Sequence, residues 1–211
     1  EAERTLGDLT ELERRFSSAE LAELESLPER RKLDRVAGRL AVKRALSAHF
    51  FGEYDWEGEA AELVISIDAA GRPRLILPKD APAPEPSFSI SHCAHGGAAA
   101  VAAPGRRVGV DIELIIPRPA EVIAFVASPG ELAAGPYDAE AQARLWTGKE
   151  ATLKMLGLGL DADARAVRPE ADGVTLTGAP AKAWIALGSP RVRLEYDGVV
   201  GARIAVAYTG D

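Results

Sequence analysis

The sequence predicts a mixed fold of helices and short strands, divided into two halves. Two helices dominate: a basic one from Pro28 to Ser47, and one that starts at Asp138 and stops at Gly157 and Gly159. Around them lie short apolar or alternating runs, typical of strands, separated by turn sequences. Pro104-Gly105 is the best position for a boundary between the halves.

The composition excludes several classes of function. The 211 residues are 47% hydrophobic, enough for one large domain or two small ones with cores of their own. No apolar run approaches the roughly 20 residues of a membrane span. The net charge of -7 argues against nucleic acid as the main partner. The single Cys93 cannot form an internal disulfide, which predicts a reducing compartment, the cytoplasm.

The first half begins with frayed helical sequence at residues 6–27, where Ser17 and Ser18 either break a helix or cap a new one. The basic helix follows, with Pro28 in its first turn. Strands are predicted at residues 63–67, 74–77, 87–91 and 98–102, with a turn at 69–73 and a proline-rich loop at 78–86.

The second half starts with a predicted strand at residues 108–113. A short helix at 121–126 and a Gly/Pro loop at 129–136 lead to the helix that Asp138 caps. Further strands are predicted at residues 174–177, 182–187, 192–196 and 202–208. Asp197-Gly198 predicts the turn between the last two strands. No internal sequence repeat is strong enough to identify.

The basic helix is unusual in an acidic protein. Arg35, Arg39 and Lys43 are spaced by four residues and therefore share one stripe. A stripe of one sign repels itself unless something neutralises it. The stripe is therefore either a solvated helix face or an anion-binding site.

Acidic residues form a second candidate site. Asp111 and Glu113 are two apart on a predicted strand, so both point to one face, where their charges repel. Glu150 completes a set of oxygen ligands suited to Mg2+. Lys154 lies four residues after Glu150, and Trp146 lies one turn before it and can border the same patch. The alternative is an ordinary solvent-exposed ion pair.

Ser91 and His92 at a strand end form a third candidate, since a hydroxyl and an imidazole can both donate to phosphate. A lone histidine is more often structural, and Cys93 and His95 are assigned structural roles. The sequence contains no Ser/His/Asp hydrolase signature, no Walker-type phosphate loop and no zinc-binding pattern.

Together these segments resemble the Sfp-type 4'-phosphopantetheinyl transferases. Three motifs carry the resemblance: F-S-I-S-H at 88–92, V-G-V-D-I-E at 108–113 and W-T-G-K-E-A-T-L-K-M-L-G-L-G-L at 146–160. The turn Gly71-Arg72-Pro73 looks like the family's G-K-P turn, and Gly38-Arg39-Leu40 looks like its N-terminal G-R segment. The set spans about residues 31–160 in the family's order.

The resemblance implies an α+β fold of two similar halves, each a long helix on a small antiparallel sheet, related by a pseudo-twofold axis. A coenzyme A cleft would lie between them. Residues 1–104 would form the half for the 3'-phosphate and adenine, and residues 105–211 the half with Mg2+ and the catalytic residues. The implied enzyme transfers the phosphopantetheine arm of coenzyme A to a serine of an acyl or peptidyl carrier protein and releases adenosine 3',5'-bisphosphate.

Residue roles follow from the matching positions. The resemblance implies that Asp111, Glu113 and Glu150 bind Mg2+, and that Glu150, or a water it orients, takes the proton of the serine. Lys154 would neutralise charge on the phosphate oxygens. The remaining contacts to coenzyme A would come from Arg35, Arg39, Arg72, Ser91 and His92. Two positions depart from the family: Arg72 replaces a lysine, and Cys93 replaces a small hydroxyl residue.

Two other functions stay open. A non-catalytic coenzyme A-binding docking domain would bind without transfer, and a Mg2+-dependent pyrophosphatase would release nucleotide without a carrier protein. The pathway, whether fatty acid, polyketide or nonribosomal peptide synthesis, is not specified. We expect a monomer or part of a multidomain synthase, without nucleic-acid or membrane partners. Because carrier proteins are also acidic, we expect docking through a local patch at residues 30–44 or 115–126.

Overall fold

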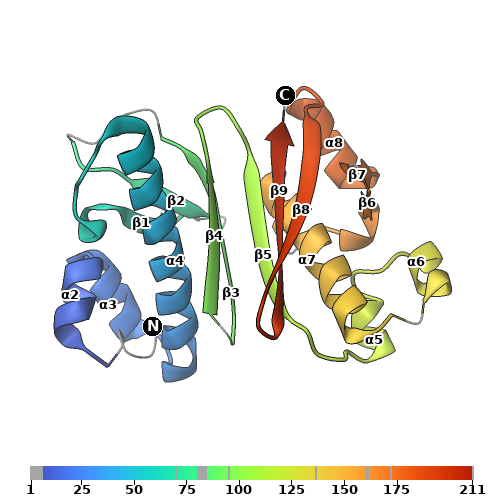
Figure 1. The fold of residues 1–211 in the computed structure, drawn as a ribbon, viewed down its shortest axis with the longest axis horizontal. Helices are drawn as coiled ribbons and strands as arrows, with labels where there is room; N and C mark the ends of the chain where they lie inside the picture. Colours follow the sequence, from blue (N-terminus) through green and yellow to red (C-terminus); the bar gives the residue numbers. More distant parts are fainter. Residues whose placement is uncertain are drawn as a thin grey trace. The chain divides into compact units, whose positions relative to one another are not determined.

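The computed structural model forms two compact units, Glu1–Pro104 and Gly105–Asp211 (Figure 1). It describes residues 7–69, 71–79, 85–94, 96–135, 137–159, 162–171 and 173–210. Each unit combines a long helix with short antiparallel strands, which confirms the predicted α+β class. No helix within these ranges is both long and apolar enough to span a bilayer. His95, Leu160 and parts of the predicted loops at 78–86 and 129–136 lie outside the described residues.

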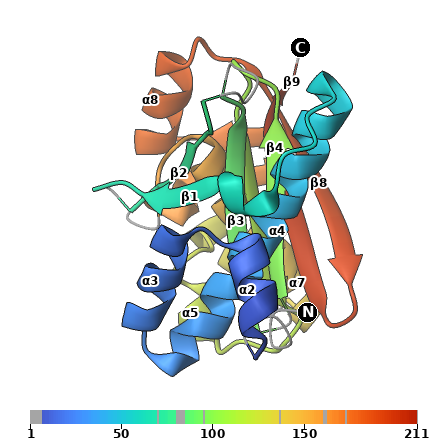
Figure 2. The same ribbon diagram turned by 90° about the vertical axis from the view of Figure 1, so that its left-hand side faces the viewer.

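Three helices open the first unit: α2 (Leu9–Arg15), α3 (Ser18–Ser26) and α4 (Glu29–Tyr54). Ser17 caps a new helix, because its side chain accepts from the Glu20 backbone while the Glu20 carboxylate accepts from the Ser17 backbone. Figure 2 shows α2 and α3 beside α4, and their apolar side chains share one buried cluster with α4. Helix α4 runs seven residues beyond the predicted end at Ser47, because Phe50 continues its buried stripe.

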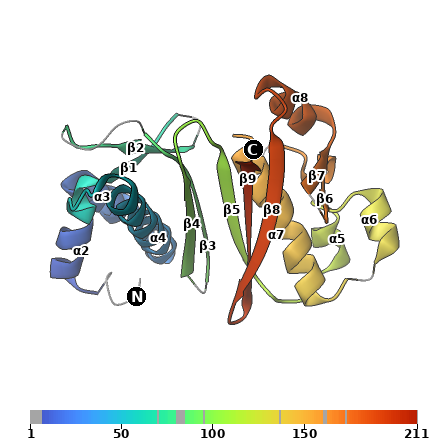
Figure 3. The same ribbon diagram turned by 45° about the horizontal axis from the view of Figure 1, so that its top comes forward.

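Two hairpins complete the first unit. Strands β1 (Val64–Ile67) and β2 (Pro73–Ile76) pair after the short 3-10 helix η1 (Ala60–Glu62), and β3 (Ser87–Cys93) pairs with β4 (Gly96–Ala102). Helix α4 packs on β3 and β4 (Figure 3). Gly97 makes this approach possible, since a Cβ there would lie 2.3 Å from the Ala37 carbonyl oxygen.

The second unit is built on a three-stranded sheet in the order β5-β9-β8. The strands are β5 (Val108–Leu114), β8 (Arg191–Val199) and β9 (Ala202–Gly210), all antiparallel. Helix α7 (Ala139–Met155), capped by Asp138 as predicted, packs on β5 and β9 (Figure 3). A Cβ at Gly109 would lie 2.0 Å from the Ala151 carbonyl oxygen, so this glycine brings β5 directly against α7.

Helix α7 ends where the sequence predicts. Leu156 is its C-cap, and Gly157 follows with a φ of 73°, a left-handed conformation that glycine adopts without steric cost. Near the end of the helix Thr152 and Leu156 are buried, whereas Leu145 in its first half is only half-buried.

The remaining elements of this unit are the helices α5 (Ala120–Ile123), α6 (Pro129–Ala134) and α8 (Gly178–Ala186), the 3-10 helix η2 (Ala164–Ala166), and the strands β6 (Val167–Glu170) and β7 (Gly173–Leu176). The predicted loop at 129–136 is wrong over α6, because Ser128 and Glu131 form a capping box with Pro129 in the first turn. Strand β6 was not predicted from the sequence. Among the described residues it pairs with β7 alone, so Pro169 lies in an edge strand, where proline is tolerated.

Two further predictions in the second unit are wrong. Residues 182–187 belong to α8 and its C-cap instead of a strand, because Ala183, Trp184 and Leu187 lie at helical spacing and pack together on the core. Asp197-Gly198 is not the hairpin turn, since both residues are paired within β8. The turn falls later, where Gly201 has a φ of 76°.

Candidate functional site

The acidic residues predicted from the sequence meet at the contact of β5 and α7. Asp111 is 5% exposed and Glu150 is 6% exposed. Burial, followed by the charge of Asp111, raises the pKa of Glu150 to about 7; Lys154 opposes this and Glu113 adds to it. The structure therefore brings all four groups within electrostatic range. The alternative of a solvent-exposed Glu150–Lys154 pair is wrong, because Glu150 is buried.

Lys154 on α7 contacts the neighbouring strand β5. Its Nζ donates to Asp111 Oδ1 at 2.7 Å and to the Val110 carbonyl oxygen at 3.1 Å. The ammonium group thus joins α7 to β5 at the acidic cluster. It compensates part of the negative charge that the three carboxylates place there.

Glu113 has a basic partner that the sequence did not reveal. Arg118 Nη2 donates to Glu113 Oε2 at 2.6 Å. The pKa of Glu113 is raised mainly by burial and then by Asp111, and Arg118 opposes the shift. Gln142 fixes the Arg118 backbone: its Oε1 accepts from the amide at 2.7 Å. The guanidinium also lies 5.5 Å from the Trp146 ring centroid, and Trp146 packs on the core near Leu153. In the sequence, Arg118 stands out only by its place between two prolines in the segment I-I-P-R-P, which does not indicate a contact with Glu113.

The chemistry of the cluster suits a hard divalent cation. Its three carboxylates, Asp111, Glu113 and Glu150, offer only oxygen donors, and Lys154 and Arg118 balance only part of their charge. Across the described part of the chain, no three His, Cys, Asp or Glu side chains are arranged to hold a metal ion. Lys154 and Arg118 contact two of the carboxylates, so the predicted ligand set would have to rearrange to close around Mg2+.

The basic stripe of α4 is neutralised within its own unit. Glu23 lies 3.3 Å from Arg35 and 3.2 Å from Arg39, and Glu20 lies 2.9 Å from Lys43. The side chains of Arg39 and Lys43 are each 3% exposed, so the interpretation as a solvated helix face is wrong. Burial lowers the pKa of Lys43, and the Glu20 carboxylate opposes that shift.

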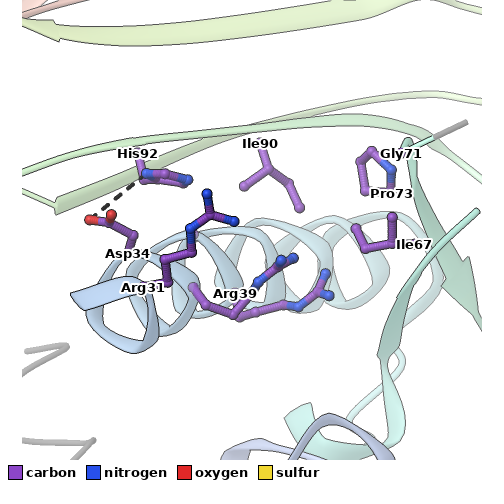
Figure 4. A pocket seen from close by; sticks show the side chains of 10 residues that line it. Arg31, Asp34, Arg39, Ile67, Gly71, Pro73, Ile90 and His92 are labelled. Atoms are coloured by element: carbon purple, nitrogen blue, oxygen red, sulfur yellow. Dashed lines mark ion pairs between the residues drawn. The ribbon is translucent and has the colours of Figure 1, made fainter. Parts of the chain in front are cut away.

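A pocket of about 460 Å³ lies beside this stripe, between α4, β3 and the β1–β2 turn (Figure 4). Its polar lining consists of Arg31, Asp34, Arg35, Arg39 and His92. The apolar side chains of Ile67, Pro73 and Ile90 form the rest of the wall. His92 Nδ1 lies 3.9 Å from Asp34 Oδ1, as the dashed line in Figure 4 marks. Three arginines line this concave surface, and an anionic ligand there would compete with Glu23 for Arg35 and Arg39.

Three of the predicted coenzyme A contacts line this pocket: Arg35, Arg39 and His92. Ser91 does not. It precedes His92 on β3 and therefore points to the opposite face of the strand. Arg72 also lies outside the lining: its side chain is 54% exposed and its Nε donates to Asp68 Oδ2 at 3.2 Å.

The sequence reasoning missed Arg31 and Asp34 as pocket residues. Arg31 lies four residues before Arg35, so an extension of the basic stripe by one turn would have found it. Nothing in the sequence near Asp34 indicates its approach to His92, which comes from β3.

Comparison with known proteins gives a similarity over part of the chain. A family model described as the 4'-phosphopantetheinyl transferase superfamily matches residues 107–187, which is less than half of the chain. The matched segment contains Asp111, Glu113, Glu150 and Lys154. No curated protein matches the sequence.

Several solved structures are similar over about half of the chain. A holo-ACP synthase from Plasmodium yoelii aligns with 49% of this chain and 92% of its own, with 21% identity and a TM-score of 0.42. An ACPS–CoA complex from Chronobacterium ammoniagenes aligns with 50% and 96%, with 21% identity and a TM-score of 0.40. A holo-[acyl-carrier-protein] synthase from Neisseria meningitidis aligns with 50% and 98%, with 16% identity and a TM-score of 0.37.

Proposed function

We propose that this protein is a 4'-phosphopantetheinyl transferase of the Sfp type, which modifies a serine of an acyl or peptidyl carrier protein. The observation that carries the proposal is the meeting of Asp111 and Glu113 on β5 with Glu150 and Lys154 on α7. The match to the transferase superfamily spans this segment and supports the same reading.

In the proposed reaction, the serine oxygen bonds to the phosphorus that bears the pantetheine arm. The bond from that phosphorus to the bridging oxygen breaks, and adenosine 3',5'-bisphosphate leaves. Glu150 takes the proton of the serine hydroxyl, directly or through a water. Lys154 neutralises charge that develops on the phosphate oxygens.

Asp111, Glu113 and Glu150 would hold Mg2+, which when bound supplies charge neutralisation and orientation for the pyrophosphate. Lys154 is 2.7 Å from Asp111 in the structure and would turn toward the phosphate oxygens. Arg118 would keep Glu113 in place at the side of the cluster. The chain thus offers three carboxylates as metal ligands. Two basic side chains, Lys154 and Arg118, hydrogen-bond to Asp111 and Glu113 among them.

The pocket beside α4 is proposed to bind the 3'-phosphate end of coenzyme A. Arg31, Arg35 and Arg39 offer guanidinium donors that suit a phosphate, and His92 adds an imidazole. Glu23 fixes the Arg35 and Arg39 side chains before the ligand arrives. Contacts from Arg72 and Ser91 stay predictions from the family resemblance, as does a cleft between the halves.

For carrier-protein docking, residues 115–126 are favoured over residues 30–44. On the outer side of α4, Lys32 is paired with Glu29, and on the inner stripe Glu20 and Glu23 pair with Lys43, Arg35 and Arg39. In contrast, Phe125 is 75% exposed and Ile116 is 48% exposed. Two large apolar side chains exposed on one short segment are what an apolar docking patch requires. Such docking would not depend on bulk charge attraction between two acidic proteins.

The test is an incubation of the protein with coenzyme A, Mg2+ and an apo-carrier protein. The proposal predicts adenosine 3',5'-bisphosphate formation only when the carrier protein is present. Binding of coenzyme A without any product would instead identify a docking domain. Nucleotide release without carrier protein would identify a pyrophosphatase. Either result would overturn the proposal.

A further inference from the structure

A fully buried lysine joins three segments of the second unit. Lys149 on α7 is 0% exposed, and its Nζ donates to Glu131 Oε2 at 2.8 Å. It also donates to the carbonyl oxygens of Ala164 at 3.2 Å and Val167 at 2.6 Å, at the two ends of η2. The Glu131 carboxylate in turn accepts from the Ser128 amide at 2.7 Å, within the capping box of α6.

The first unit contains the same arrangement. Lys43 on α4 donates to Glu20 Oε2 at 2.9 Å and to the carbonyl oxygens of Ala60 and Leu63, each at 2.8 Å, at the two ends of η1. Glu20 is the capping-box residue of α3, where it accepts from the Ser17 amide at 3.0 Å. We call each set of lysine, capping-box glutamate and two carbonyl groups a lysine clamp.

The sequence does not reveal that the two units share this arrangement, because the separation between the lysine and its glutamate differs. Lys43 follows its glutamate by 23 residues, whereas Lys149 follows its glutamate by 18. Both clamps tie the middle of a long helix to a short capped helix before it and to a 3-10 turn after it. All three donor positions of each ammonium group are used.

A contribution to the stability of the fold does not by itself explain the lysine clamps. A buried ion pair is often no more stabilising than well-packed apolar side chains of similar volume. The three directed hydrogen bonds of each clamp also fix the rotation of the long helix about its axis and its position along that axis.

Each clamp lies next to residues that the proposed function uses. Lys149 directly precedes Glu150, and Lys43 follows Arg39 by one turn. Glu20 Oε1 lies 4.0 Å from the Arg39 guanidinium.

We infer that Lys149 and Lys43 are positioning residues with separate targets. The Lys149–Glu131 clamp fixes the turn of α7 that carries Glu150 against Asp111. The Lys43–Glu20 clamp fixes the turn of α4 that carries Arg39 at the pocket. Neither lysine touches substrate. This inference rests on the proposed transferase function for its kinetic consequences, and on the contacts above for its structural ones.

The test compares matched variants of the two units. Lys149→Met and Lys43→Met each remove one ammonium group, and the double variants K149M/E131Q and K43M/E20Q also remove the unpaired carboxylate charge. Glutamine keeps the capping box intact. If a single variant does not fold, its double variant replaces it, because no buried charge is then left unpaired. Rates are measured where circular dichroism shows each variant folded.

The inference predicts different kinetic effects from the two clamps. Loss of the Lys149 clamp lowers kcat by about 10- to 100-fold and leaves the KM for coenzyme A nearly unchanged, since a small misplacement of a reacting group is costly. Loss of the Lys43 clamp raises the KM for coenzyme A by about tenfold and changes kcat little. Wild-type kinetics in the folded variants, or the same parameter affected in both units, would show a purely structural role and overturn the inference.

If the wild-type protein transfers nothing, the proposed function is refuted. The structural part of the inference is then tested by amide hydrogen exchange. In K149M/E131Q, the α7 amides at residues 147–154 should exchange at least about tenfold faster, while the amides of β9 keep their protection. In K43M/E20Q, the faster exchange should appear in α4 around Arg39. Unchanged exchange at both positions would overturn the inference on its structural side.

Discussion

Replacement of Glu150 by glutamine should stabilise the metal-free protein at pH 8. Glu150 is 6% exposed, and burial beside Asp111 raises its pKa from 4.5 to about 7. A raised carboxyl pKa means that the folded state binds the proton more tightly than the unfolded state. Raising a pKa by one corresponds to about 1.4 kcal/mol, so the ionised carboxylate costs the folded state up to about 3 kcal/mol above pH 7.

The sign of the pH dependence follows from the raised pKa. Below pH 4.5 Glu150 is protonated in both states and has no such cost. Between pH 4.5 and pH 7 the free energy of unfolding falls as pH rises, and above pH 7 the loss is complete. Because other groups titrate as well, the informative quantity is the difference between wild type and E150Q. That difference should grow in favour of E150Q by about 3 kcal/mol from pH 4 to pH 8.

The assay is urea denaturation of both proteins in EDTA at several pH values between 4 and 8. A second series with Mg2+ in place of EDTA should stabilise the wild type and change E150Q far less, because one ligand is lost. A difference between the two proteins that stays constant across the pH range would refute the buried, charge-coupled Glu150. Equal stabilisation of both by Mg2+ would refute its role as a ligand.

Three further predictions concern packing, ligand binding and docking. Gly109→Ala should cost about 3 kcal/mol, because its Cβ would lie 2.0 Å from the Ala151 carbonyl oxygen. Gly130→Ala in α6 meets nothing within 4 Å and should not destabilise the protein, and thermal denaturation of both variants measures the difference. His92→Ala should raise the KM for coenzyme A by about tenfold with kcat kept, and an unchanged KM would remove His92 from the site. Phe125→Ser should raise the KM for the carrier protein only; an equal effect on coenzyme A would contradict docking at residues 115–126.

The sequence was sufficient where local signals decide the structure. Asp138 and Gly157 mark the ends of α7 through a side-chain cap and a left-handed glycine, and both act between near neighbours. The strand predicted at residues 108–113 is β5, and the two-residue spacing of Asp111 and Glu113 placed both side chains on one face of it. A local signal was also present but overlooked for α6, where Ser128 and Glu131 have the residue types and spacing of a capping box.

Long-range partners could not be predicted from the sequence. Lys149 looks like an ordinary helix-surface lysine until α6 and η2 fold over it. Glu20 and Glu23 neutralise the basic stripe of α4 only because α3 packs beside it. The orientation of Ser91 away from the pocket depends on which face of β3 meets α4. In each case the decisive contact joins residues far apart in the chain.

The most direct test of the account is the intact mass of an apo-carrier protein after incubation with coenzyme A, Mg2+ and this protein. The account predicts that wild-type protein adds the mass of one phosphopantetheine to the carrier. Folded Glu150→Gln protein should do so at least about 100-fold more slowly. An unmodified carrier with the wild type, or equal rates for both proteins, would contradict a transfer centre built from Asp111, Glu113, Glu150 and Lys154.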